Sequence, residues 1–268
     1  MAKWFFCAAG WVTLAAMSGL GACSNQEKAP AADKTPIDAT GAAQWTPLFN
    51  GKDFDGFYTY LEKQGKNNDP NGLFRVENGM IHIMAIPQAT ETQNTGYLAT
   101  EKMYGNFDLR FEYKWGEKRF APRARMPRDS GCHYLFTGDD KVWENAIECQ
   151  IQEGETGDVY NLNNAYTVKT TVKSLDDRIK TFAENGVPWT MTGNRLQRSE
   201  TADSLLTWNQ VEIIVRGNSS THIVNGKLVA HLDSITTRDG VPVTEGRIAF
   251  QEEAAEMYYR NIEIKFLK

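Results

Sequence analysis

The feature that most constrains this chain is an alternation of apolar and polar residues. It is clearest at 107–115, where Phe, Leu, Phe, Tyr and Trp alternate with Asp, Arg, Glu and Lys. Successive side chains of an extended chain point to opposite faces, so this segment predicts a strand with one face on a core and the other in water. The pattern returns at 211–215, 221–224 and 260–266. These segments predict a protein built from antiparallel strands.

Turn residues separate the predicted strands. Asn225-Gly226 predicts a tight hairpin, because both central residues of such a turn need positive φ. Further turn signals occur at Asn50-Gly51, Asp55-Gly56, Asn78-Gly79, Thr137-Gly138-Asp139 and Asp239-Gly240. Short strands with turns at this spacing, and almost no helical periodicity, predict an all-β antiparallel sandwich. The pattern at 174–185 allows a helical turn or two, but Gly186-Val187-Pro188 ends it, and we expect this segment to be an excursion on a long loop.

The first 43 residues differ in composition from the rest. A positive start, Met-Ala-Lys, precedes an apolar run from Trp4 to Met17 and small residues up to Ala22. The run is too short to span a bilayer comfortably, as in a cleaved secretory signal. We therefore expect 1–22 to be a signal peptide. Residues 23–43 are rich in Ala, Pro, Thr, Lys and Asp, which predicts a disordered tether, and 44–268 remain as one domain.

The end of the predicted signal, Leu20-Gly21-Ala22-Cys23, resembles the bacterial lipoprotein signal, in which the cysteine is lipidated. The resemblance implies a membrane anchor through Cys23, stabilised by ~0.8 kcal/mol per buried methylene. Ser24 rather than Asp follows, which favours the outer membrane, with the domain facing the periplasm. An ordinary secretory signal followed by an unrelated cysteine is the alternative.

Charge and cysteine content limit the partners and the covalent links. The formal net charge is −5, and it becomes −5 − 1 = −6 when Lys3 leaves with the signal. A mildly acidic surface gives no reason to expect a nucleic acid partner. Cys7 lies in the signal and Cys23 is the expected lipid site, so Cys132 and Cys149 remain. Export permits a disulfide between them, and two buried thiols fit the pattern equally well.

Two adjacent strand-like runs, 128–136 and 146–154, carry the most informative polar residues. On the second run apolar residues alternate with polar ones, so Glu148 and Gln150 share a face, ~7 Å apart. That spacing suits hydrogen bonds to vicinal sugar hydroxyls. A plain water-facing sheet surface would give the same pattern.

Three further features are candidates for a site. His133 and His222 are two of the four histidines, and imidazole is well suited to proton transfer near neutral pH, although a single histidine is more often a core or surface residue. The segment 114–128 has six cations against one acid. It is either a solvated loop or a loop over a cleft, where a cation stabilises charge on a substrate oxygen. Trp143 and Tyr160 are either sugar-stacking or core aromatics.

Motifs of several other enzyme classes are missing from the sequence. It contains no Gly-rich phosphate loop, no Gly-x-Ser-x-Gly, no His-Glu-x-x-His and no Cys-x-x-Cys. This argues against nucleotide-binding, serine-hydrolase and zinc-protease functions.

Several blocks stand in a fixed order along the domain, at 45–53, 129–131, 148–154, 208–212, 222–226, 246–251 and 259–262. Together they resemble the 3-keto-disaccharide hydrolase family, which is common in lipid-anchored and secreted bacterial proteins. The resemblance runs from about residue 44 to 268. It implies a concanavalin-like jelly roll, with two antiparallel sheets and the ligand on the concave face.

The resemblance also implies activity on glycosides that a separate sugar 3-dehydrogenase has oxidised at C3. A ketone at C3 acidifies the C2 proton, so a base can remove it and the aglycone then leaves C1 by elimination. Water adds back to complete net hydrolysis. Such a route needs a base near C2, an electrophile for the enolate oxygen and an acid for the leaving group.

Under this resemblance we expect Glu148 or His133 to be the base. The residues expected to bind substrate are Gln150, Glu153, Ser130, Arg128, Trp143, His222, Gln251 and Arg260. An arginine or a bound divalent metal ion would polarise the C3 carbonyl, but no tight ligand cluster stands out, so the cofactor stays unknown. A non-catalytic glycan-binding module is the alternative, because fold alone does not determine activity.

The chain departs from the family pattern after Gln251. Where many relatives carry a Gly-containing stretch, this chain adds three acids, Glu252, Glu253 and Glu256. We therefore expect a different rim of the cleft, which puts the leaving-group preference in doubt.

Overall fold

The computed structural model describes residues 43–86 and 95–268. The expected signal peptide, the expected lipid site Cys23 and nearly all of the expected tether lie outside them. No helix in the described part is long and apolar enough to cross a membrane.

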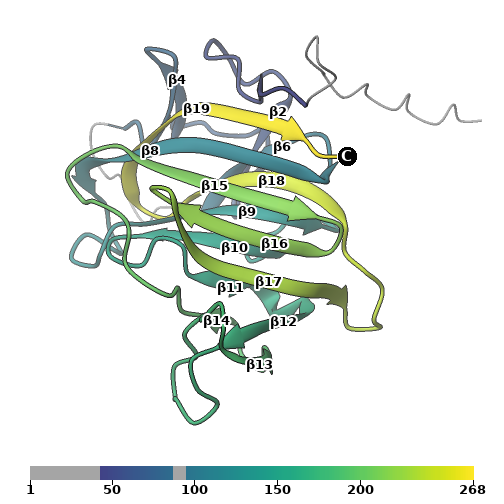
Figure 1. Ribbon diagram of the computed structural model, residues 1–268. Coiled ribbons are helices and arrows are strands. Elements are labelled where there is room, and N and C mark those ends of the chain that lie inside the picture. Colours follow the sequence, from purple (N-terminus) through teal and green to yellow (C-terminus); the bar gives the residue numbers. More distant parts are fainter. Residues whose placement is uncertain (1–42, 87–94) are drawn as a thin grey trace, which may run out of the picture. The chain divides into compact units, whose positions relative to one another are not determined.

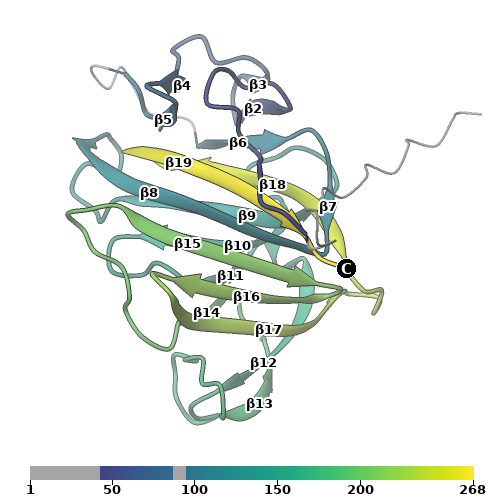
Figure 2. The same ribbon diagram turned by 45° about the horizontal axis from the view of Figure 1, so that its top comes forward.

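The described part consists of two sheets in which every strand pairing is antiparallel (Figure 1). Sheet 1 has ten strands. Their order is β13 (Val187–Thr190), β12 (Tyr166–Val172), β17 (Lys227–Thr237), β16 (Ser219–Val224), β15 (Asn209–Arg216), β8 (Phe107–Arg119), β19 (Ala255–Phe266), β5 (Met80–Ile83) and β4 (Phe74–Glu77), with β1 (Thr46–Pro47) beside β19. Figure 2 shows β8, β15, β16 and β17 side by side in this sheet.

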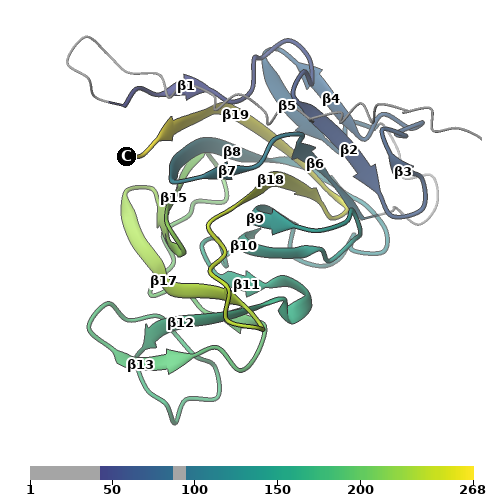
Figure 3. The same ribbon diagram turned by 90° about the vertical axis from the view of Figure 1, so that its right-hand side faces the viewer.

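Sheet 2 has nine strands and supports the site described below. Their order is β14 (Arg195–Leu196), β11 (Val159–Asn161), β10 (Asn145–Gln152), β9 (Asp129–Thr137), β18 (Glu245–Glu252), β6 (Gly96–Thr100), β2 (Phe57–Leu61) and β3 (Gly65–Lys66), with β7 (Tyr104–Gly105) beside β18. A short 3-10 turn, η1 (Leu162–Asn164), follows β11. Figure 3 shows β15 and β17 in one layer and β9 and β10 in the other. The fold is a concanavalin-like jelly roll, as predicted.

The main core lies between the two sheets. Apolar residues of β8 point inward and their polar neighbours point outward, which confirms the strand predicted at 107–115. Phe111 of β8 packs edge to face against Phe250 of β18, with ring centroids 5.4 Å apart. Ile147 and Cys149 of β10 are fully buried in the same core. Glu148 and Gln150 therefore point to the opposite side of sheet 2.

The other strand and hairpin predictions are also confirmed. The segments 211–215, 221–224 and 260–266 lie within β15, β16 and β19. Asn225 and Gly226 join β16 to β17 with φ values of 49° and 78°, as a tight hairpin requires. Strand β8 runs on to Arg119, which pairs with Ala255. Part of the cation-rich segment is therefore strand rather than loop.

The segment 174–185 is an excursion on a long loop, as expected, and it forms no helical turn. The segment consists of bends, a turn and isolated β-bridges, which join Val172 to Phe182 and Thr181 to Gln197. Phe182 is buried in the core. The extended backbone that places this ring and makes the bridges is incompatible with a helix, so tertiary packing overrides the local pattern.

Cys132 and Cys149 stand opposite one another in the register of β9 and β10. Both are free and fully buried, and burial raises the pKa of each thiol well above its ordinary value. Of the two alternatives left open by the sequence, the structure has the buried thiols.

Candidate active site

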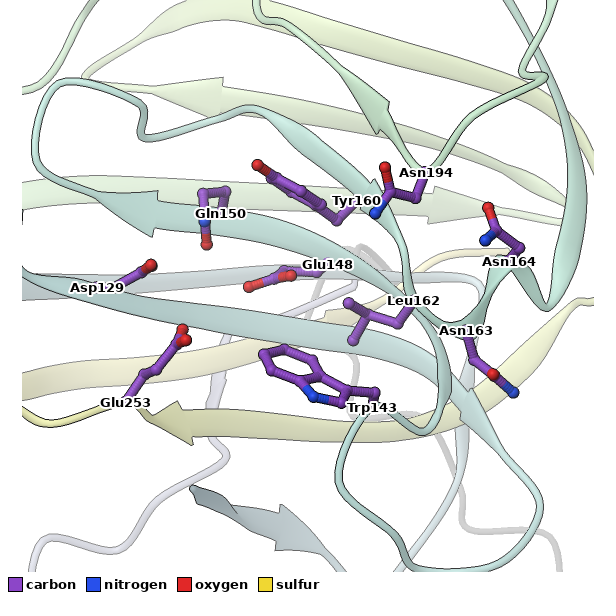
Figure 4. A pocket seen from close by; sticks show the side chains of 10 residues that line it. All are labelled: Asp129, Trp143, Glu148, Gln150, Tyr160, Leu162, Asn163, Asn164, Asn194 and Glu253. Atoms are coloured by element: carbon purple, nitrogen blue, oxygen red, sulfur yellow. The ribbon is translucent and has the colours of Figure 1, made fainter. Parts of the chain in front are cut away.

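A pocket of about 310 Å³ opens on the side of sheet 2 that faces away from the core (Figure 4). Strands β9, β10 and β11, the turn η1 and three loops supply its walls. The lining residues are Asp129, Trp143, Glu148, Gln150, Tyr160, Leu162, Asn163, Asn164, Asn194 and Glu253. The volume suits a ligand the size of one or two sugar rings.

The pocket has two chemically different ends. Figure 4 shows Asp129, Glu148, Gln150 and Glu253 gathered on one side, which we call the acidic end. The other side, the aromatic end, combines two aromatic rings and a leucine with three side-chain amides. Its members are Trp143, Tyr160, Leu162, Asn163, Asn164 and Asn194. Carboxyl groups at one end and rings with amides at the other suit a polar, hydroxyl-rich ligand.

Glu148 lies across the neighbouring strand because that strand has a glycine beneath it. Gly131 of β9 pairs with Gln150 of β10. A Cβ at Gly131 would be 2.0 Å from Glu148 Oε1 and 2.8 Å from its Cδ, far inside contact distance. The missing side chain therefore gives the Glu148 carboxyl group its place at the acidic end.

His133 stands behind Glu148, between two carboxyl groups. Its Nδ1 is hydrogen-bonded to Glu144 Oε1, and its Nε2 lies 3.7 Å from Glu148 Oε1. Burial alone would lower the pKa of His133, but Glu144 and Glu148 outweigh burial and raise it to about 10. The ring is therefore an imidazolium at neutral pH. It holds its proton too tightly to act as the base, which leaves Glu148 of the two predicted candidates.

Asp129 and Glu253 face one another at the acidic end and share one cation (Figure 4). Arg123, on the loop between β8 and β9, donates to Glu253 Oε1 at 3.0 Å through Nη1 and to Asp129 Oδ2 through Nη2. Burial and the nearby Glu253 raise the pKa of Asp129 to about 8, and burial raises the pKa of Glu253. The pair therefore holds a proton at neutral pH.

Several buried polar atoms around the pocket have no hydrogen-bond partner among the described residues. Gln150 Oε1, Gln251 Oε1, His133 Nε2 and Asp129 Oδ1 belong to this set. Gln251 lines a small recess that it shares with His133 and Trp143. An unsatisfied buried polar group costs ~1–3 kcal/mol, and a polar ligand would remove that cost.

Predicted residues Glu148, Gln150 and Trp143 line the pocket, with His133 and Gln251 behind it. Ser130 instead points between the sheets, where its hydroxyl donates to the Gln251 carbonyl at 2.7 Å. The structure therefore leaves Ser130 out of the pocket, because neighbouring residues of a strand face opposite sides.

His222 also lies between the sheets rather than in the pocket. Its Nδ1 donates to the Gly157 carbonyl at 3.2 Å, and its Nε2 accepts from the Tyr134 hydroxyl at 2.8 Å. Burial lowers the pKa of His222 to about 4, so the ring is neutral. His222 alternates along β16 with outward-facing residues, so its side chain points into the core together with those of Ser220 and Val224.

The remaining predicted substrate contacts form ion pairs elsewhere. Arg128 Nε bonds Glu153 Oε1 at 2.5 Å, and Arg128 lines a separate surface cleft. Arg260 Nε bonds Glu112 Oε2 at 2.6 Å on the outer side of sheet 1, with its guanidinium 3.8 Å from the centre of the Trp208 ring. Arg128, Glu153 and Arg260 thus do not line the pocket.

The sequence patterns did not single out Asp129, Glu144 or the asparagines of the aromatic end, and they indicated Glu253 only as part of the rim of the cleft. Alternate residues of a strand point to the same face of the sheet, a property we call strand parity. Asp129 has the same parity as Gly131 and His133, so parity alone could have placed Asp129 on the pocket side. Glu144 and Glu253 come from segments just outside their strands, where parity gives no guidance.

No three His, Cys, Asp or Glu side chains within the described ranges are grouped so that they could hold a metal ion. The carboxyl groups of the acidic end are already engaged with Arg123 or His133. The residues that line this pocket therefore do not fit a bound metal ion.

The fold and the pocket define a jelly-roll protein with an acid-lined ligand site. From 44 to 265 the chain matches the family described as the 3-keto-alpha-glucoside-1,2-lyase-like domain, and it belongs to that family. No curated protein sequence gives a significant match.

Solved structures with the same fold are distant in sequence. A candidate glycosyl hydrolase from Parabacteroides distasonis ATCC 8503 is 18% identical, with a TM-score of 0.51, over 84% of this chain and 94% of its own. A second structure so described from that organism has the same identity and a TM-score of 0.50, over 84% and 100%. A structure from work on endo-acting O-glycanases of the human gut microbiota is 10% identical, with a TM-score of 0.50, over 84% and 99%. These likenesses concern the fold alone.

Proposed function

We propose that the domain is a carbohydrate-active enzyme that cleaves 3-keto-glycosides, including 3-keto-disaccharides, by elimination across C2 and C1 followed by hydration. The observation that carries the proposal is the Glu148 carboxyl group, which faces a sugar-sized pocket over Gly131 and has the His133 imidazolium behind it. A glycan-binding module needs rings and amides but no such arrangement of titratable groups.

Glu148 takes the proton from C2, which the C3 ketone has acidified, and the C–H electron pair passes into the enolate. The C1–O bond then breaks and the aglycone leaves. In the second half, the oxygen of a water molecule bonds to C1, the proton that this water loses balances the one taken up by the departed aglycone oxygen, and Glu148 returns its proton to C2. Glu148 is thus unchanged after one cycle, and the net reaction is hydrolysis.

The surrounding residues support this step without exchanging protons with C2. The amides of Gln150, Asn163 and Asn194 line the same pocket and can donate to the oxygen at C3 as it gains charge. Trp143, which is 46% exposed, and Tyr160 offer ring faces at the aromatic end. His133 positions Glu148 and offsets the charge of the two acids beside it.

Incubation of the purified domain with 3-keto-trehalose or a chromogenic 3-keto-glucoside tests the proposal. We expect release of the sugar with the wild type and a loss of ~10³-fold in kcat with Glu148→Gln. Glu112→Gln, which alters a carboxylate on the outer side of sheet 1, is the matched control and should keep full activity. Tight binding without release would support the glycan-binding alternative and reject the enzyme.

We further propose an exported lipoprotein, anchored through Cys23 with its domain in the periplasm, where a sugar 3-dehydrogenase supplies the oxidised substrate. The support is the sequence from Leu20 to Cys23 and the small residues before it. Labelled palmitate should enter the wild-type chain and not the Cys23→Ser variant when each is produced in bacteria. Equal labelling of both would reject the anchor.

A further inference from the structure

The acidic end contains more carboxyl groups than the proposed base requires. Glu148 is sufficient to remove the C2 proton, yet Asp129 and Glu253 also line the pocket. Asp129 is 5% exposed, and the Glu253 side chain is 14% exposed. Burying two more charged acids in one pocket costs free energy, and a shared proton would reduce that cost by removing one charge.

Arg123 holds this pair in one arrangement. Its two terminal nitrogens bind one oxygen from each acid, Glu253 Oε1 and Asp129 Oδ2. Asp129 Oδ1 is left without a hydrogen-bond partner among the described residues. The free oxygen belongs to a buried, fixed carboxyl group at the wall of the pocket, as an acid that acts on a bound ligand requires.

The distance between the pair and Glu148 fits one sugar ring. Asp129 and Gly131 are alternate residues of β9, so their Cβ positions lie ~7 Å apart. The Glu148 carboxyl group occupies the place of the missing Gly131 Cβ. Two groups at this separation can reach the C2 proton and the C1 oxygen of the same ring.

Resting on the proposed function, we propose that Asp129 and Glu253 share one proton and act together as the general acid for the oxygen that leaves C1. This assigns the enzyme to 3-keto-glycosides of aliphatic alcohols, including sugars, whose alkoxides are poor leaving groups.

The proton balance closes over one cycle. During elimination Glu148 accepts the C2 proton, the C1–O bond breaks, and the pair gives its proton to the departing oxygen. During hydration the pair, now without that proton, takes one from water as the hydroxide oxygen bonds to C1. Glu148 then returns its proton to C2. No oxidant, reductant or other reactant is needed.

The test compares two leaving groups on the same sugar. Methyl and 4-nitrophenyl 3-keto-glucosides of one anomeric configuration differ in that only nitrophenolate leaves readily without a proton. We expect Glu253→Gln to lower kcat/KM for the methyl glycoside ~10²-fold or more and for the nitrophenyl glycoside less than ~10-fold. With Gln at 253, Arg123 faces Asp129 alone and stabilises its ionised form, so the proton is lost.

Glu112→Gln is the matched control, because this carboxylate pairs with Arg260 on the outer side of sheet 1, away from Asp129, Glu253 and Arg123. It should leave the ratio of the two rates unchanged. Asp129→Asn provides a second variant should Glu253→Gln lower the melting temperature sharply. An equal loss on both glycosides, or no loss on either, would overturn the assignment of the pair. Wild-type inactivity on both would overturn the proposed function itself.

The wild type gives an independent readout. The pKa of Asp129 is raised to about 8, so the proton is present below that pH and absent above it. We expect kcat/KM for the methyl glycoside to fall ~10-fold per pH unit above about 8, while the nitrophenyl glycoside keeps its rate. Parallel profiles for the two substrates would contradict the assignment.

Discussion

Two glutamates on different sheets lie over a glycine of the adjacent strand. In sheet 2, Glu148 occupies the space above Gly131. In sheet 1, Glu256 of β19 lies over Gly116 of β8, where a Cβ would be 2.3 Å from Glu256 Cγ. The steric arrangement is the same in both places, so any difference in role must come from the partners.

Glu256 has its acceptor capacity filled by the protein. It accepts backbone N–H groups of Glu117 and Lys118 at 2.9 and 3.1 Å and contacts the Lys118 ammonium and the His82 ring. Burial alone would raise the pKa of Glu256, but the hydrogen bonds from Lys118 and His82 lower it. Glu148 faces a pocket and has His133 at 3.7 Å. Under the proposed function, the filled hydrogen-bond acceptors of Glu256, rather than its burial, distinguish it as a structural carboxylate from the base Glu148.

Replacing each glutamate by glutamine gives the largest expected contrast. Glu148→Gln should reduce kcat ~10³-fold with an unchanged melting temperature. Glu256→Gln should keep kcat and lower the melting temperature, because an amide nitrogen then meets two N–H donors. Steady-state kinetics and thermal unfolding of both variants measure this. A large loss of kcat in Glu256→Gln would break the distinction.

Adding a methyl group beneath each glutamate should have the next largest effect. Gly131→Ala pushes the Glu148 carboxyl group out of its place, and a displacement of about 1 Å can cost ~10²-fold in kcat. Gly116→Ala instead disturbs Glu256 and should affect stability alone. Kinetics of the two alanine variants, with circular dichroism as the check on folding, tests the pair. Full activity in Gly131→Ala would show that Glu148 does not need this position.

Removing the cation behind Glu148 should change the pH profile. In His133→Gln, Glu144 and Glu148 face one another without the imidazolium, and each disfavours the charge on the other. We expect kcat/KM to fall ~10-fold at the acidic end of the pH profile and less at higher pH, because the imidazolium that favours two charged carboxylates is missing. His82→Gln, beside Glu256, is the control and should leave the profile unchanged. An identical loss at all pH values would contradict a positioning role.

The smallest effect concerns stability and contrasts Glu256 with its neighbour Glu252. Burial raises the pKa of Glu252 to about 8, so the fold binds its proton more tightly than the unfolded chain does. The stabilisation of the fold by the proton on Glu252 is therefore fully present below about pH 4.5 and is lost as the pH rises through 8. The pKa of Glu256 is lowered, so its charged form stabilises the fold at pH values above the ordinary pKa of a glutamate. This stabilisation is lost as the pH falls and the carboxylate takes up a proton.

Thermal unfolding between pH 4 and 9 checks these signs. Glu252→Gln should raise the melting temperature by several degrees at pH 9 and leave it nearly unchanged at pH 4, since ionising a buried acid costs ~1.4 kcal/mol per pKa unit. Glu256→Gln should lose most at neutral pH and least at pH 4. The same slope in both variants would show that the two acids do not differ in this way.

Local parity explains which parts of the fold the sequence could predict. The alternation in β8 and the Asn225-Gly226 turn depend on neighbouring residues only, and both are confirmed. Parity also placed Glu148 and Gln150 on the side that opens into the pocket. The helical spacing at 174–185 gave no such guidance, because the burial of Phe182 decides the backbone there.

The rest of the site depends on which distant segments meet. Glu253 follows β18 and Asn194 precedes β14, yet both reach a pocket built on β9 and β10. Strand order, which no local pattern encodes, brings them there. His222 was misplaced for a related reason, because its strand belongs to the other sheet and turns its ring into the core.

The reactivity of the two facing thiols measures how often strands β9 and β10 separate. Cys132 and Cys149 have no solvent-exposed surface, so a thiol-specific dye can react only when β9 and β10 come apart. The rate of labelling therefore reports how often this central pair of strands separates. Because those strands carry Glu148 and Asp129, a slow rate would mean that the site is held by one of the least mobile parts of the molecule.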